Sequence, residues 1–220
     1  MGPRVRPIHL ETKTDWTVGD LFDRVGACVR QALAGGVAVT VSAEDATRAP
    51  LDRLCELAGT AERAGASRIH LPDTTGGGSP TAIARVVAEV ESVLDEAEIG
   101  VHCHDDCGLA VANTLAGFAA GADVGAVTVY GIGERAGNAP LGAVAVALEA
   151  LHGVETGIDT TTLTTLSRAV GRRAVTGYPG RQTLGEHRAG GRRRAGARER
   201  AIPGIGGFGV GPAVVFSRRS

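Results

Sequence analysis

Short apolar runs alternate with longer amphipathic stretches along the first 150 residues of the chain. The apolar runs have the length and the β-branched content of buried strands, and they occupy 5–10, 37–41, 67–72, 99–103 and 125–130. The amphipathic stretches have the periodicity of helices and occupy 18–36, 49–64, 79–94, 107–121 and 138–151. Strand–helix units repeated about every 30 residues predict parallel strands joined by right-handed crossovers.

Polar residues gather directly after each predicted strand. In parallel α/β folds the carboxyl ends of the strands meet at one rim, and ligands bind there. A doubly wound open sheet would share this property, but polar ends on five successive strands favour a TIM-type (β/α)8 barrel. The polar groups are Glu11, Ser42 with Glu44 and Asp45, Asp73 with Thr74 and Thr75, His102 with His104, Asp105 and Asp106, and Glu134 with Arg135 and Asn138.

Composition excludes several classes of protein. A hydrophobic content of 43% and a formal net charge of -1 give no indication of overall disorder, of a nucleic-acid partner or of a membrane surface. The longest apolar run is shorter than the roughly 18 residues that span a bilayer, and the N-terminus lacks the apolar segment of a signal peptide. The four cysteines form no CxxC pair. We therefore expect a cytoplasmic protein with reduced thiols.

The C-terminal part breaks the alternation. Six arginines lie between Arg188 and Arg200, and a glycine-rich stretch without helical or strand periodicity follows them. A nucleic-acid-binding arm is one interpretation of such a segment, but we interpret it as a solvated, disordered tail. The predicted organisation is a barrel domain at 1–160, the start of a helical linker or subdomain at 161–187, and the tail at 188–220.

The sequence HCHDD at 102–106 contains the most specific candidate chemistry. His102 and His104 are two residues apart in a predicted strand, so their side chains project to the same side. Two imidazoles at a strand end suit a divalent metal ion, although a solvated histidine pair is the alternative. Asn138 lies after the next strand in a glycine-rich turn, and its amide oxygen is a natural third neutral ligand.

Four segments in the same order resemble a known family. VHCHDDCGLAVANTLAGFAAGA at 101–122 and TVYGIGERAGNAPL at 128–141 are similar to the double signature of the homocitrate synthase and 2-isopropylmalate synthase family. These are acyl-CoA-condensing, metal-dependent TIM barrels with a pyruvate carboxyltransferase-type domain. VTVSAEDATR at 39–48 and IHLPDTTGGGSP at 69–80 resemble two further family segments.

The resemblance implies a Claisen-type acyltransferase that condenses acetyl-CoA with a 2-oxo acid to give a 2-hydroxy acid and CoA. It implies a divalent cation, Mg²⁺, Mn²⁺ or Zn²⁺, and a homodimer or a complementing partner chain. The Gly-Glu-Arg sequence at 133–135 argues against the lyase and aldolase branches of the same superfamily. The implied residues are His102, His104 and Asn138 for the metal, Glu44, Glu134 and Arg135 for catalysis, and Ser42, Thr74, His9 and Glu11 for the substrate.

The chain also departs from the family pattern. It lacks the RDG turn that supplies an aspartate ligand and an arginine for the oxo acid, and its five predicted strands match the last five of eight. We therefore expect an N-terminally truncated barrel that is a poor catalyst by itself, or a non-catalytic remnant or subunit. Thr40 replaces the arginine that meets a distal carboxylate in homocitrate synthases, and Asp105 replaces an asparagine. The resemblance ends after the GEH sequence at 185–187.

Overall fold

The computed structural model describes residues 15–174 and 214–217. Its sheet contains four parallel strands in chain order, so the predicted parallel α/β architecture is confirmed. The parallel strands are β1 (Thr40–Ser42), β2 (Arg68–Asp73), β3 (Glu98–Cys103) and β4 (Val124–Val127). The first predicted strand, at 5–10, lies outside the described residues.

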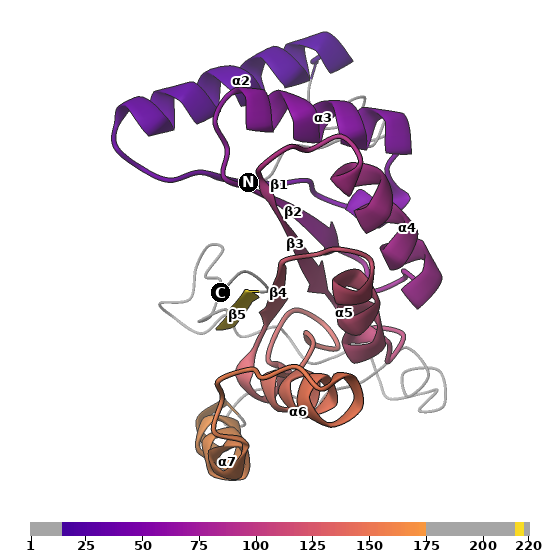
Figure 1. Cartoon of the computed structure of the whole chain (residues 1–220), viewed down its shortest axis with the longest axis vertical. Coiled ribbons are helices and arrows are strands. Elements are labelled where there is room, and N and C mark those ends of the chain that lie inside the picture. The colour runs from indigo at the N-terminus through magenta and orange to yellow at the C-terminus, as the bar shows by residue number, and fades with distance from the viewer. Residues whose placement is uncertain (1–14, 175–213, 218–220) are drawn as a thin grey trace, which may run out of the picture.

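The helices form a layer against the sheet. α3, α4 and α5 follow one another along one face, α2 lies beside α3, and α6 and α7 lie toward the β4 end (Figure 1). Their bounds are α2 (Val18–Ala34), α3 (Leu51–Arg63), α4 (Pro80–Glu91), α5 (Ala110–Ala119), α6 (Leu141–His152) and α7 (Leu163–Ala174), with 3-10 turns η1 (Ala46–Arg48), η2 (Val129–Gly131) and η3 (Thr160–Thr162).

Local sequence explains where two of these helices begin. Before α2, the Thr17 hydroxyl accepts a hydrogen bond from the Asp20 amide at 3.1 Å, and the Asp20 carboxylate accepts one from the Thr17 amide at 2.9 Å. This reciprocal pair is a capping box. Before α4, Ser79 caps the helix and Pro80 occupies its first position, as the sequence predicts.

One face of the central strands forms the apolar core. Alternate side chains of a strand point to opposite faces, and Ile69, Leu71, Ile99 and Val101 are almost completely buried. This face is the one that the helices cover, because a Cβ placed on Gly117 of α5 would lie only 2.9 Å from Val101 Cγ1. The glycine therefore allows α5 to pack directly on β3.

The opposite face of the same strands is polar. At the N-terminal ends of β2 and β3, Arg68 Nε donates to the Glu98 carboxylate at 2.8 Å. His70 pairs in register with Gly100, and a Cβ at position 100 would overlap the His70 ring. His102 follows two residues after Gly100 on this face. The sheet therefore carries histidines on the face opposite the described helices.

Two strand ends differ from their predicted positions. The strand predicted at 125–130 ends at Val127, because Tyr130 and Gly131 adopt left-handed conformations, with φ of 64° and 68°, that a strand excludes. The strand predicted at 37–41 pairs only from Thr40, where its register with Arg68 of β2 begins. The early end of β4 lengthens the loop at the polar rim, and the late start of β1 lengthens the loop at the opposite end of the sheet.

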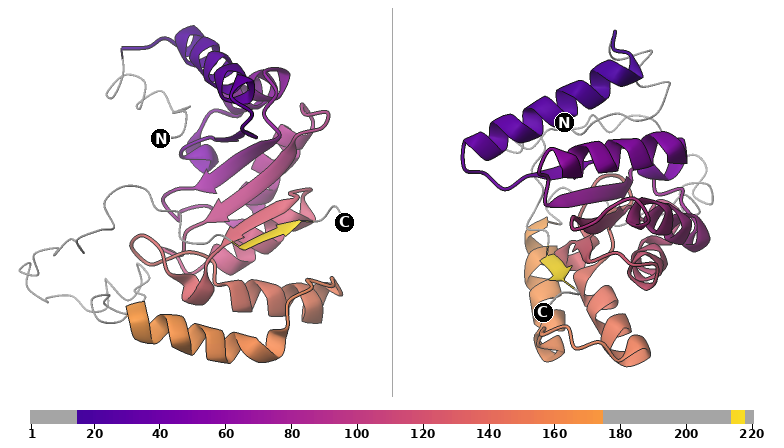
Figure 2. Two further views of the ribbon diagram at one scale, coloured as in Figure 1. Left: turned by 90° about the vertical axis from the view of Figure 1, so that its left-hand side faces the viewer. Right: turned by 45° about the horizontal axis from the view of Figure 1, so that its top comes forward.

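The C-terminal segment corrects one expectation. No strand was predicted within 188–220, yet β5 (Val214–Ser217) pairs antiparallel with β4 and lies alongside it (Figures 1 and 2). The edge of a sheet offers unpaired backbone groups that accept an extended segment from any distance in sequence. The apolar, β-branched sequence VVFS suits this position. The arginine-rich part of the tail lies outside the described residues.

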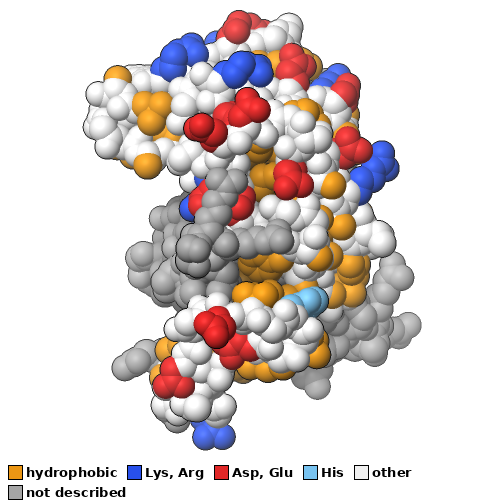
Figure 3. All heavy atoms as spheres, in the orientation of Figure 1, with side chains coloured by type: hydrophobic (Ala, Val, Ile, Leu, Met, Phe, Trp, Pro, Cys, Tyr) orange, Lys and Arg blue, Asp and Glu red, His pale blue; other side chains and the backbone are white. Residues whose placement is uncertain are grey.

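The surface over the N-terminal helices is mixed in charge. Acidic and basic side chains are interspersed over α2, α3 and α4, and apolar side chains show between these helices and α6 (Figure 3). In the part of the chain that the structure describes, every helix is too short or too polar to cross a bilayer.

Candidate metal centre

His102 and His104 lie together at the carboxyl end of β3. Their ring centroids are 4.9 Å apart and the ring planes are perpendicular, at 89°. His102 is the penultimate residue of β3, and His104 follows the strand in an isolated bridge. The strand alternation thus brings both imidazoles to the same side, as expected for residues i and i+2.

Asn138 lies directly opposite His104. The two residues form an antiparallel bridge, flanked by hydrogen bonds from the Asp105 amide to the Gly137 carbonyl at 2.9 Å and from the Ala139 amide to the Cys103 carbonyl at 3.2 Å. This pattern defines a non-hydrogen-bonded pair, in which opposed Cα atoms are roughly 4.5 Å apart and the side chains share a face. The backbone therefore places Asn138 beside His104.

The loop that delivers Asn138 turns through several left-handed residues. Gly131 and Gly137 have φ of 68° and 101°, which glycine adopts without strain, whereas Arg135 has φ of 56°. Gly133 packs against the Asn138 side chain, because a Cβ at position 133 would lie 2.5 Å from Asn138 Cγ. The glycines thus allow the loop to pack closely against the Asn138 amide.

Two polar atoms in this cluster are buried without a hydrogen-bond partner, His104 Nδ1 and Asn138 Oδ1, a property that His70 Nε2 and Asn113 Oδ1 share elsewhere. The other end of the Asn138 amide is fixed, since its Nδ2 donates to the Ile132 carbonyl at 3.1 Å and leaves Oδ1 as the outward acceptor. Unpartnered buried acceptors cost free energy unless a ligand satisfies them. Their chemistry, imidazole nitrogen and amide oxygen, fits a divalent cation.

Burial keeps both imidazoles neutral. Desolvation lowers the pKa of His102 to about 4, and the neighbouring His104 adds to this effect. Desolvation also lowers the pKa of His104, with a further contribution from the positive charge of Arg135. Only a neutral imidazole has a lone pair for a metal ion. Around neutral pH both rings are therefore available as ligands.

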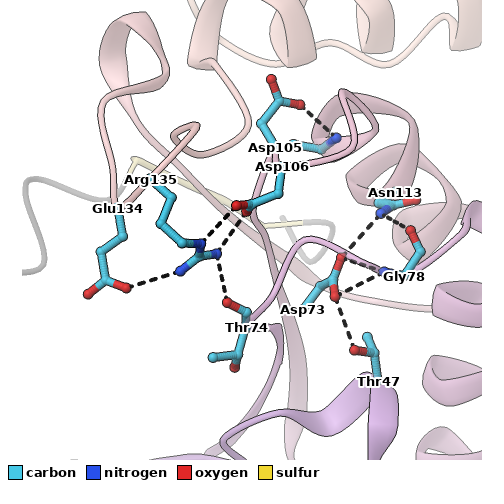
Figure 4. Close-up of polar contacts among 10 residues, drawn as sticks. Thr47, Asp73, Thr74, Gly78, Asp105, Asp106, Asn113, Glu134 and Arg135 are labelled. Carbon is cyan, nitrogen blue, oxygen red and sulfur yellow. Dashed lines mark hydrogen bonds and ion pairs between the residues drawn. The ribbon is translucent and has the colours of Figure 1, made fainter. Parts of the chain in front are cut away.

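The two aspartates after His104 make other contacts. Asp105 accepts a hydrogen bond from the Ala110 amide at the start of α5, at 3.0 Å. Asp106 forms a two-pronged ion pair with Arg135, whose Nε and Nη2 each lie 2.8 Å from a carboxylate oxygen (Figure 4). In the described ranges, no group of three His, Cys, Asp or Glu side chains could hold a metal ion. The predicted ligand set therefore stays two imidazoles and one amide, without a carboxylate.

A second buried polar cluster surrounds Asp73 at the end of β2. The Asp73 carboxylate accepts hydrogen bonds from the Gly78 amide at 3.0 Å, from the Thr47 hydroxyl at 3.0 Å and from Asn113 Nδ2 at 3.4 Å (Figure 4). Asn113 Nδ2 also donates to the Gly78 carbonyl at 2.8 Å. This carboxylate links η1, the loop after β2 and α5, so its role is structural.

The remaining predicted site residues lie around the rim at different depths. Thr74 follows β2, and its hydroxyl accepts a hydrogen bond from the Asp45 amide at 2.9 Å. Ser42 and Glu44 are half-buried at the end of β1, and Thr40 is exposed. Glu134 is 74% exposed, and its carboxylate lies 3.4 Å from Arg135 Nη1. His9 and Glu11 lie outside the described residues.

Sequence reasoning placed Asp106 and Asp73 on the rim without predicting their partners, and it gave no role to Asn113. The sequence did contain a signal for the contact between Asp106 and Arg135. These opposite charges follow neighbouring strands, and a parallel sheet brings such strand ends together. Asn113 had no comparable signal. It lies within an apolar helical pattern, and only the packing of α5 on the loop after β2 brings it to Asp73.

Known proteins resemble the chain in sequence and in fold. A homocitrate synthase, AksA, of Methanopyrus kandleri is 45% identical over 163 residues, which are 74% of this chain and 41% of that protein. A 2-isopropylmalate synthase of Sulfurisphaera tokodaii is 45% identical over 172 residues, 78% of this chain and 44% of that protein. The chain thus spans less than half the length of these relatives.

Among solved structures, an HMG-CoA lyase of Bacillus subtilis superposes with a TM-score of 0.68 at 15% identity, covering 85% of this chain and 65% of that one. At this identity the likeness concerns the fold alone. Fold and rim together define part of a TIM-type α/β barrel with its polar groups at the carboxyl ends of the strands. The chain belongs to the HMGL-like family, whose model matches residues 4–170.

Proposed function

We propose that this chain forms the metal-binding part of a Claisen-type acyltransferase that joins acetyl-CoA to a 2-oxo acid. The observations that support the proposal are the 4.9 Å approach of the His102 and His104 rings, the bridge between His104 and Asn138, and two polar atoms buried without a partner. These three side chains would hold a divalent cation, Mg²⁺, Mn²⁺ or Zn²⁺. When bound, the cation supplies Lewis-acid polarisation of the keto carbonyl of the oxo acid.

The surrounding residues would orient the substrate. Ser42, Glu44 and Thr74 lie on the rim of the neighbouring strands and would contact the oxo acid. The methyl group of acetyl-CoA is a weak acid, so a base must be placed close to it, and Glu44 is our candidate. Burial of the site excludes water from the reacting carbon atoms and strengthens every electrostatic interaction there.

Sequence relatives favour a synthase over a lyase. The relatives that share 40–46% identity with this chain are named homocitrate, 2-isopropylmalate or citramalate synthases. The HMG-CoA lyase structures share the fold at 15–22% identity. Thr40, in place of an arginine for a distal carboxylate, favours a 2-oxo acid with an apolar side chain over 2-oxoglutarate.

A second candidate function is that of a subunit that binds the metal but needs a partner chain to complete the barrel. The donor set of the described residues supports it, because it lacks an anionic oxygen ligand, which hard divalent ions prefer. A second copy of this chain or a complementing chain would then supply the carboxylate. Mixing the chain with such a partner should raise its affinity for Mn²⁺.

The test is to purify the 220-residue chain and measure CoA release with 2-oxoisovalerate, 2-oxoglutarate and oxaloacetate in Mg²⁺, Mn²⁺ or Zn²⁺. We expect release to depend on the metal, to be greatest with 2-oxoisovalerate, and to be lost in His102→Ala. The His152→Gln variant is the matched control, since it removes a histidine that is exposed at the end of α6. Metal-dependent cleavage of 3-hydroxy-3-methylglutaryl-CoA would favour the lyase branch.

A further inference from the structure

Arg135 connects the loop after β4 to the ends of both β3 and β2. Its Nε and Nη2 donate to the two oxygens of Asp106 at 2.8 Å each, and Nη2 also donates to the Thr74 carbonyl at 2.9 Å (Figure 4). Asp106 follows β3, and Thr74 follows β2. One guanidinium thus joins three neighbouring loops of the rim.

The geometry of this contact requires an arginine. The planar guanidinium offers two parallel N–H groups to one carboxylate and a further N–H to a carbonyl, which the single ammonium of lysine cannot do. The Asp106 side chain is only 9% exposed, so a strong partner must offset its desolvation. The pair therefore has a fixed orientation.

The contact also stabilises an unfavourable backbone conformation at Arg135. Arg135 has φ of 56°, a left-handed conformation that non-glycine residues adopt at a cost on the order of 1 kcal/mol or more. From this point a short turn leads to the metal ligand, because the Gly137 amide donates to the Glu134 carbonyl at 2.9 Å and the Gly137 carbonyl accepts from the Asp105 amide at 2.9 Å. Asn138 follows at once, opposite His104.

We propose that Asp106 and Arg135 form a latch that fixes the 131–138 loop and thereby positions the Asn138 amide beside His104. They are positioning residues, and the guanidinium faces protein acceptors at the rim. This assignment replaces the catalytic role that the family resemblance implies for Arg135. As far as it concerns metal affinity, it rests on the proposed function of His102, His104 and Asn138.

Hydrogen exchange of the amides of Gly137 and Asn138 tests the latch without any metal. The variants are Asp106→Asn, Arg135→Lys and Arg135→Gly; glycine suits the left-handed backbone, so it removes the side chain without adding strain. We expect exchange in peptides covering 131–138 to rise at least about 10-fold in each variant, since the loop then opens locally. The control is Arg68→Gln, which breaks the Arg68–Glu98 pair at the other end of the same strands.

Mn²⁺ titration of the same variants provides the second readout. We expect affinity to fall about 10- to 100-fold in the latch variants, the usual range for groups that orient a metal ligand, and to stay unchanged in Arg68→Gln. The double variant Asp106→Asn with Arg135→Gly should be no weaker than either single variant, because both remove one interaction.

The outcomes separate the latch from the metal site. Unchanged loop exchange in Asp106→Asn and Arg135→Gly would overturn the latch, whatever happens to metal binding. If the unaltered chain binds no Mn²⁺, the proposed metal function fails, while loop exchange still decides the latch. Exchange that rises equally over the whole chain in Arg135→Lys would indicate global destabilisation and would also contradict the proposal.

Discussion

The polar clusters at the ends of β2 and β3 are both buried, yet they differ in how their hydrogen bonds are satisfied. Around Asp73, the carboxylate receives donors from Thr47, Gly78 and Asn113, although the Asn113 oxygen itself has no partner. Around His104, one ring nitrogen and the Asn138 oxygen have no partner. A carboxylate with several donors stabilises the fold, whereas candidate ligand atoms without a partner cost free energy that a bound ligand would recover. This contrast separates scaffold from site more clearly than residue type does.

The largest effect should come from the Asp73 cluster. Asp73→Ala leaves the Gly78 amide and the Thr47 hydroxyl without their acceptor and removes one of the two acceptors of Asn113 Nδ2, so we expect the free energy of unfolding to fall by about 4 kcal/mol. Urea denaturation monitored by circular dichroism measures this change. A loss smaller than about 1 kcal/mol would remove the distinction between the two clusters.

Acid should destabilise the polar face of the sheet. Burial lowers the folded-state pKa of both His70 and His102 from 6.5 to about 4. Between pH 6.5 and 4 the unfolded chain therefore binds more protons, and stability falls as pH falls through this window, then levels off below pH 4. The expected loss is on the order of 3 kcal/mol per histidine.

Denaturant midpoints measured from pH 7 to pH 4 give this slope. His70→Leu should remove about half of it, because His70 is one of the two histidines whose pKa burial lowers to about 4. Stability that is flat across this window in the unaltered chain would show that the imidazoles are solvated, and the contrast between the two clusters would weaken.

Removing a proposed metal ligand should reduce metal affinity more than stability, whereas Asp73→Ala should mainly reduce stability. His104→Ala should weaken Mn²⁺ binding on the order of 100-fold, or about 3 kcal/mol of binding free energy. The metal-free protein should lose only about 1 kcal/mol, because deleting the unpartnered Nδ1 offsets part of the lost packing. Isothermal titration and urea denaturation of the same preparation give both values. A large loss of stability with unchanged affinity would reverse the assignment.

The smallest effect should come from the loop glycine that packs on the amide. An added Cβ in Gly133→Ala would lie 2.7 Å from Asn138 Oδ1, so the amide must shift. We expect Mn²⁺ affinity to fall about 10-fold, with little change in unfolding. Gly36→Ala, where a Cβ meets nothing within 4 Å, is the control for placing alanine at another loop glycine, although its φ of 78° adds backbone strain. Equal Mn²⁺ affinities of Gly133→Ala and the unaltered chain would show that the loop shifts to accommodate the added methyl group.

Sequence patterns predicted the strand–helix order and much of the rim, but not the ends of the elements. The helix predicted from 138 begins at Leu141, because Asn138 is held in its bridge with His104 and Thr128 bridges to Pro140. The helix predicted from 107 begins at Ala110, after Gly108 turns with φ of 72°. Such ends depend on contacts between loops, which periodicity does not record.

The sequence by itself determined which residues could meet at the rim, because the alternation of strands and helices sends every strand end to one edge of the sheet. It also determined that His102 and His104 share a side, since that follows from local strand geometry. Only the tertiary structure decided that Arg135 binds Asp106, that Asn113 reaches Asp73, and that β5 pairs with β4. These contacts join segments far apart in the chain, and their energies depend on burial and hydrogen-bond geometry that exist only in the folded state.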